Sequence, residues 1–127
     1  MKKEELEQRL IIFAVRIIKL AEYNKKNYAG YHMLKQIIRS ATSVPLNYGE
    51  AQGGESINDF IHKMQIVLKE LRETYINLRI VKQSNLNSKK NELENLLIEN
   101  NELISIFIKS VETAKKNRKS KIVNRKL

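Results

Sequence analysis

The chain has 127 residues, 42% of them hydrophobic and 30% charged, so its length fits one domain that can bury its own core. It contains no cysteine, which excludes disulfides, thiolate metal sites and cysteine nucleophiles. No apolar run approaches the roughly 20 residues that a bilayer requires, and the first residues lack the apolar segment of a secretory signal. We therefore expect a cytoplasmic protein that does not enter a membrane.

Positive charge is concentrated at the C-terminal end. The net charge is +10, and residues 115–127 hold seven of the 24 basic residues and none of the 14 acidic ones. The remaining 17 basic and 14 acidic residues give the rest of the chain the balance of an ordinary soluble domain. The charge pattern therefore divides the chain into a bundle over residues 1–114 and a flexible basic tail over residues 115–127.

Apolar residues at three- and four-residue spacing, with one proline and four glycines, predict an all-α chain. Four helices are expected, over residues 3–25, 31–52, 56–83 and 88–116. Pro45 lies inside the second helix, where it removes a backbone donor, so we expect a kink there or, alternatively, a full break. Ser56 followed by Asp59 is a capping signal for the third helix.

The four-residue loop before the fourth helix forces neighbouring helices to lie antiparallel, which predicts a four-helix bundle. The first helix is apolar around more of its circumference than one core contact requires. The additional apolar residues are Ile11, Ile12, Val15 and Ile18. A face of this width predicts oligomerisation.

The sequence shows no convincing catalytic or metal-ligating pattern. His32 and His62 are the two histidines, and neither has a second ligand at helical spacing. Gly53 and Gly54 form too short a glycine run to cradle a nucleotide and are interpreted as a helix terminator. We therefore expect a protein that is not an enzyme and that binds no metal or cofactor.

Polar residues of the second predicted helix advance by four, four and three residues, so they share one face. They are Arg39, Ser43, Asn47 and Glu50. This face is either a partner site or, the interpretation we prefer, a half-buried hydrogen-bond network that fixes the kink and the helix register. Glu70 and Glu73 of the third helix are candidate partners for Arg39.

The stretch LKQIIRSATSVPLNYGEA, residues 34–51, and the following residues 60–74 resemble the bacterial 23S rRNA intervening-sequence proteins. The positions that carry this resemblance are Gln36, Arg39, Ser40, Ser43, Pro45, Asn47, Glu50, Phe60 and Glu70. The resemblance implies an up-down-up-down bundle that assembles as a ring-like homopentamer. It also implies kinship with the accessory proteins of diversity-generating retroelements, which resemble binders of nucleic acid and reverse transcriptase.

The leading hypothesis for function is electrostatic, sequence-tolerant binding of RNA or DNA. The tail has no aromatic residue for base stacking, so phosphate contacts are expected. Candidate contacts are Lys115, Lys116, Arg118, Lys119, Lys121, Arg125 and Lys126 in the tail, with Lys63, Lys69, Arg72 and Arg79 on the third helix. Two alternatives remain open: the tail only solubilises the protein, or the oligomer is a scaffold for a protein partner.

Overall fold

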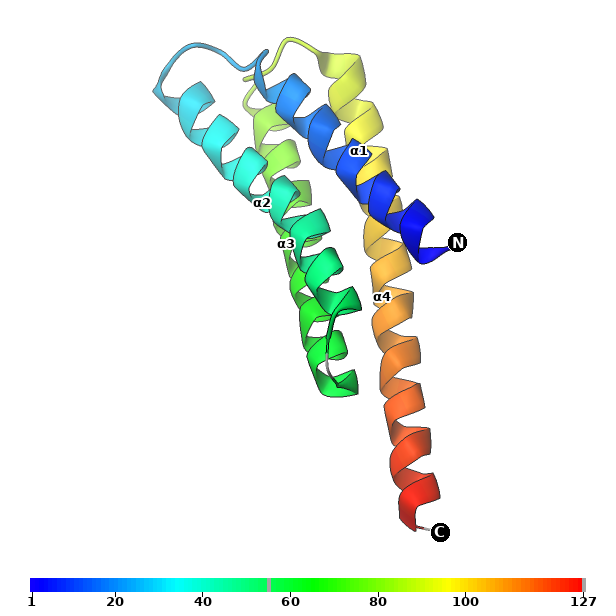
Figure 1. Ribbon diagram of the computed structural model, residues 1–127. Helices are drawn as coiled ribbons and strands as arrows, with labels where there is room; N and C mark the ends of the chain where they lie inside the picture. Colours follow the sequence, from blue (N-terminus) through cyan, green and yellow to red (C-terminus); the bar gives the residue numbers. More distant parts are fainter. Residues whose placement is uncertain (55, 127) are drawn as a thin grey trace.

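The computed structural model describes residues 1–54 and 56–126, and side chains up to residue 121. It contains four helices, α1 (Lys3–Ala21), α2 (Tyr28–Gln52), α3 (Ile57–Gln83) and α4 (Lys90–Lys126) (Figure 1). In the described part, the one extended pairing is an isolated bridge between Asn24 and Asn87. The predicted all-helical fold with four helices is therefore confirmed.

The four helices are arranged as the corners of a bundle. α1 packs on α2 and α4, and α3 packs on the same two helices. The α1–α2 and α3–α4 connections lie at one end of the bundle, and the α2–α3 connection lies at the other (Figure 1). Since no contact joins α1 to α3 within the described residues, these two helices occupy opposite corners.

Large apolar side chains from every helix fill the core. Leu10 and Phe13 of α1 and Leu71 of α3 are completely buried. The Tyr48 ring of α2 meets the Phe107 ring of α4 edge to face, with their centroids 5.7 Å apart. Burying a side chain of this kind stabilises a fold by about 1.5–3 kcal/mol, so packing holds the bundle together.

The polar connections at one end are held by side-chain hydrogen bonds. Asn87 Nδ2 donates to Leu20 O (2.8 Å) and to Asn24 Oδ1 (2.7 Å), while Asn24 Nδ2 donates to Gly30 O (3.1 Å). Asn87 is buried, and its amide adds a hydrogen bond to Leu20 O, which also accepts one from Tyr23 N at 3.0 Å. These contacts end α1 at Ala21, earlier than the predicted residue 25.

Capping residues set the starts of α2 and α3. The Ser56 side chain accepts a hydrogen bond from Asp59 N (3.1 Å), which confirms the predicted cap of α3. Asn27 Oδ1 accepts one from Gly30 N (2.8 Å), so α2 begins at Tyr28 rather than near Tyr31. Tyr31, the first residue of the predicted helix, is 49% exposed.

Two predicted features of the later chain differ from the structure. α2 continues without interruption through Pro45, so the alternative of a full break is wrong, and the kink stays a prediction. α4 continues to Lys126, past the predicted end at residue 116. The basic segment is therefore helical through Lys126, and it projects beyond α2 and α3 (Figure 1), while its flexibility stays a prediction.

Candidate functional site

The C-terminal part of α4, residues 115–126, is a strongly basic helix that we call the basic end. The last buried residues before it are Val111 and Ala114, so the helix leaves the core as the basic run begins. Four lysines of the basic end are exposed: Lys115, Lys116, Lys119 and Lys121. The candidate side chains of Arg125 and Lys126 lie outside the described residues.

Arg118 anchors the basic end to the start of α3. Its Nη1 atom donates a hydrogen bond to Asn58 Oδ1 at 3.2 Å. This contact is exposed to solvent. The four exposed lysines of the basic end form no ion pair with any described residue. The basic end can therefore contact several anionic groups at once.

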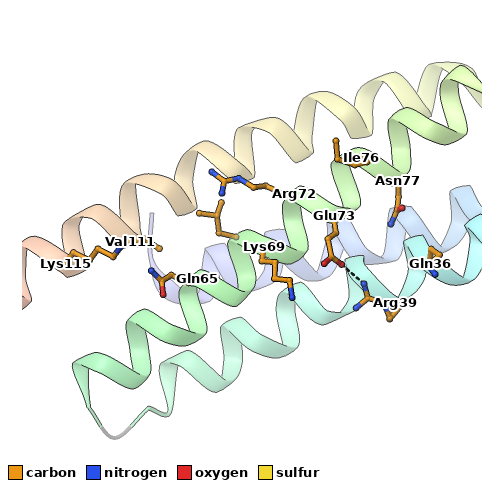
Figure 2. Close-up of a pocket in the computed structure, with 11 residues that line it drawn as sticks. Gln36, Arg39, Gln65, Lys69, Arg72, Glu73, Ile76, Asn77, Val111 and Lys115 are labelled. Carbon is orange, nitrogen blue, oxygen red and sulfur yellow. Dashed lines mark hydrogen bonds and ion pairs between the residues drawn. The ribbon is translucent and has the colours of Figure 1, made fainter.

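A second basic feature is a groove of about 880 Å³ between α2, α3 and α4 (Figure 2). Its charged lining consists of Arg39, Lys69, Arg72, Glu73 and Lys115. Its apolar lining consists of Leu68, Ile76 and Val111. The groove thus combines a positive charge with apolar contact surface.

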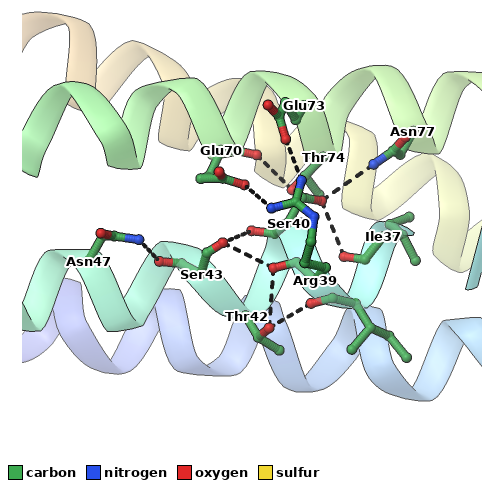
Figure 3. Close-up of polar contacts among 11 residues, drawn as sticks. Ile37, Arg39, Ser40, Thr42, Ser43, Asn47, Glu70, Glu73, Thr74 and Asn77 are labelled. Carbon is green, nitrogen blue, oxygen red and sulfur yellow. Dashed lines mark hydrogen bonds and ion pairs between the residues drawn. The ribbon is translucent and has the colours of Figure 1, made fainter. Parts of the chain in front are cut away.

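The cations of this groove differ in their ion pairing. Arg39 forms ion pairs with Glu73 and, at 3.3 Å, with Glu70 (Figure 3). The pKa of Arg39 is raised, mainly by its hydrogen bond to Glu73. Lys69 and Arg72 form no ion pair with any described residue. Uncompensated positive charge therefore remains on the α3 side of the groove.

A buried polar cluster lies between α2 and α3 beside this ion pair (Figure 3). Thr74 Oγ1 lies 2.8 Å from both Ser40 Oγ and Glu70 O, and Asn77 Nδ2 donates to Ser40 Oγ at 3.4 Å. Ser40 and Thr74 are both completely buried. The sequence carried one signal for the cluster, because Thr74 interrupts the apolar series of α3.

The predicted polar face of α2 separates into three sets of contacts. Ser43 Oγ donates to Arg39 O (3.0 Å) and Asn47 Nδ2 to Ser43 O (2.8 Å), so both bond within their own helix (Figure 3). Glu50 pairs instead with Lys63 of α3. Arg39 alone of the four reaches Glu70, so this face is not one continuous network.

The candidate nucleic-acid contacts on α3 do not form a single patch. Lys63 is paired with Glu50, whereas Lys69 and Arg72 line the groove. Arg79 lines a separate hollow of about 310 Å³ between α3 and α4, together with Ile98. Within the described residues, the densest run of unpaired cations is therefore the basic end of α4.

The described part of the chain offers no cluster of three or more His, Cys, Asp or Glu side chains that could hold a metal ion. Of the helices described here, none combines the length and apolarity needed to span a membrane. Both features with uncompensated charge, the basic end and the groove, are suited to ionic and hydrogen-bond contacts with an anionic surface.

This architecture defines a four-helix-bundle protein whose last helix carries a basic extension. Residues 2–109 match the family model described as 23S rRNA-intervening sequence protein, so the chain belongs to that family and the predicted resemblance is confirmed. The basic end begins after the matched region.

One solved structure similar to this chain is a crystal structure of a protein of unknown function from the S23 ribosomal protein family of Bacteroides thetaiotaomicron VPI-5482. It has a TM-score of 0.78 and 30% sequence identity, and the match covers 88% of this chain and 99% of that one. No curated protein matches the chain.

Proposed function

We propose that this chain is a non-catalytic, cytoplasmic protein that binds RNA or DNA through the basic end of α4, without reading the base sequence. The observation that carries the proposal is one helical segment with seven basic and no acidic residues, which projects past the other helices (Figure 1). Each phosphate that such a segment neutralises releases condensed counterions, so affinity follows from charge and falls with added salt.

The chemistry of the basic end favours phosphate contacts over base contacts. Its side chains are lysine, arginine and small polar or aliphatic residues, with no aromatic ring on which a base could stack. A helix spaces its cations at 1.5 Å per residue along the axis, so several can follow one nucleic-acid backbone. The expected ligand class is therefore any accessible RNA or DNA strand.

We also propose an up-down-up-down bundle that assembles as a homopentameric ring. The positions of the three connections support this topology (Figure 1). Exposed apolar residues on α1, between 37% and 49% exposed, support an assembly that covers them. A ring of five copies carries five basic ends, which raises the affinity of weak single contacts through effective concentration. Kinship with retroelement accessory proteins stays a prediction.

The test neutralises the basic end without shortening it. The variant Lys116→Gln/Lys119→Gln/Lys121→Gln retains good helix formers and removes three exposed charges. The matched control, Lys25→Gln/Lys35→Gln/Lys90→Gln, removes three exposed charges elsewhere on the bundle. Binding of a fluorescent single-stranded RNA is measured by anisotropy over a series of salt concentrations.

Removing phosphate-binding cations has a defined signature in this experiment. The slope of log affinity against log salt should become shallower by roughly 0.7 for each phosphate of a single strand that the variant no longer neutralises. We expect this change for the basic-end variant and a nearly unchanged slope for the control. Equal effects in the two variants would show that only net charge matters, and unchanged binding of both would contradict the proposal.

The second candidate function is a scaffold whose ring binds a protein partner. Exposed apolar residues outside α1, such as Leu46 (67% exposed) and Ile98 (60% exposed), favour it, because an electrostatic nucleic-acid binder does not need them. A scaffold on the bundle should bind its partner equally well with and without the basic end. The anisotropy experiment therefore distinguishes the two functions, since a scaffold predicts no salt-sensitive RNA binding at the basic end.

A further inference from the structure

The outward side of α1 carries an apolar stripe bounded by glutamates. Ile11, Val15 and Ile18 are 37%, 42% and 39% exposed and follow one another by four and three residues. Glu4 and Glu7 precede the stripe and Glu22 follows it on the same helical face. The outward side of α1 is therefore apolar from Ile11 to Ile18 and acidic on either side of this stripe.

The outward side of α3 has the same spacing and the opposite charge. Lys69, Arg72 and Ile76 follow one another by three and four residues and all line the groove. Ile76 and Ile80 are 49% and 45% exposed. The exposed face of α3 thus presents two isoleucines toward one end and unpaired cations toward the other.

These features also match in height along the bundle. The ends of α1 and α3 lead into connections that bond to each other, with Lys25 N donating to Leu86 O at 2.8 Å. We take the last residues of α1 and α3 as level on the basis of this bond, and counting back from them at the same rise per residue places Ile18 and Ile80 at equal height. Val15 lies near the height of Ile76, and Glu7 has the height of Lys69.

We propose that the outward side of α1 packs against the outward side of α3, in the α2–α3–α4 groove, on the next copy of the chain. This interface rests on the ring assembly proposed above. Because α1 and α3 occupy opposite corners, the contact uses two different surfaces and is heterologous, and heterologous contacts that close generate rings. In a ring whose axis is parallel to the long axis of each bundle, neighbouring copies are not shifted along that axis. Residues at equal height on neighbouring copies therefore meet.

This register gives two apolar contacts and one ion pair between neighbouring copies. Ile18 and Val15 of one copy meet Ile80 and Ile76 of the next, which removes exposed apolar surface from water. Glu7 meets Lys69, which has no ion-pair partner among the described residues of its own copy. Lys69 and Arg72 then belong to the assembly interface, and nucleic-acid binding is left to the basic end.

Two single variants and their combination test the interface. Ile18→Lys places an unpaired cation against the apolar side chain of Ile80, and Ile80→Glu places an unpaired anion against that of Ile18, so each single variant buries a charge without a partner. The combined variant Ile18→Lys/Ile80→Glu places the new opposite charges against each other across the interface. The control Leu46→Lys changes a 67% exposed apolar residue of α2 that lies outside both faces. Molar mass is measured by light scattering during size exclusion, and circular dichroism reports folding.

We expect both single variants to remain helical and to lose the wild-type mass, whereas the combined variant and the control retain it. A single variant that keeps the wild-type mass, a combined variant that stays dissociated, or a control that dissociates would each overturn the interface. A monomeric wild type would overturn the ring itself. RNA binding is measured separately, so its failure leaves the interface result intact.

Discussion

Gly30 is the residue at which the connection between α1 and α2 leaves no space for a side chain. A Cβ atom there would lie 1.8 Å from Lys25 O, and Gly30 O accepts a hydrogen bond from buried Asn24. Gly30→Ala must therefore shift the backbone or break this hydrogen bond, and we expect the free energy of unfolding to fall by about 2–4 kcal/mol. Urea denaturation followed by circular dichroism measures this change.

Gly49 provides the matched control for the same substitution. It lies within α2, and no atom stands within 4 Å of the position of an added Cβ. Alanine is the better helix former there, so Gly49→Ala should raise the free energy of unfolding by about 0.5–1 kcal/mol. A similar effect of both substitutions would show that the contact at Gly30 is not the cause.

The buried Ser40–Thr74 pair couples α2 to α3 through hydroxyl groups. Ser40→Ala and Thr74→Val should each lower the free energy of unfolding by about 0.5–1.5 kcal/mol, the usual net value of one hydrogen bond. The double variant should lose less than the sum, because each single change already removes the shared 2.8 Å contact. Strict additivity in a denaturation cycle would contradict the coupling.

Two arginines of α1 connect that helix to α4. Arg16 Nη2 lies 2.8 Å from Glu92 Oε1, and Arg9 Nη2 lies 2.6 Å from Glu99 Oε1. The hydrogen bond from Arg16 is the main cause that lowers the pKa of Glu92 below its ordinary 4.5. Because the folded state holds the charged carboxylate more strongly than the unfolded state does, the pair stabilises the fold above that pH.

This linkage predicts how stability changes with acid. As the pH falls below 4.5 toward the lowered pKa of Glu92, the folded state loses the contribution of the pair. Arg16→Met should abolish that part of the decrease and cost less than about 1 kcal/mol at neutral pH, since both side chains are partly exposed. Urea midpoints at pH 7 and pH 3 measure both effects, and equal pH dependence in wild type and variant would contradict the assignment.

The helices could be predicted from apolar spacing, but some of their ends could not. Ser56 identified the start of α3 because its cap is local in sequence. The end of α1 depends on Asn87, which is 67 residues away from Leu20, so the spacing within α1 could not reveal it. The groove was equally inaccessible, because it requires the relative heights of three helices. Glu70 and Glu73 could be named only as candidate partners of Arg39, because the sequence does not give the register of α2 against α3 that brings them together.

At the scale of the whole molecule, folding and the proposed ligand binding involve different parts of the chain. The family match ends at residue 109, and Ala114 is the last buried side chain among those the structure describes. Beyond it, Arg118 makes one exposed hydrogen bond to Asn58, and exposed polar contacts contribute little to stability. The basic end therefore adds charge to the bundle while it leaves the core unchanged.

A chain that ends at Ala114 should separate the two properties. We expect the free energy of unfolding, measured by urea denaturation, to fall by less than about 0.5 kcal/mol, as it does for surface changes. The oligomeric state should equal that of the full chain. Its salt-sensitive RNA binding should disappear, because the seven basic residues of the basic end are gone. RNA binding that survives this deletion would place the phosphate contacts on the bundle, and dissociation of the oligomer would mean that the basic end takes part in assembly.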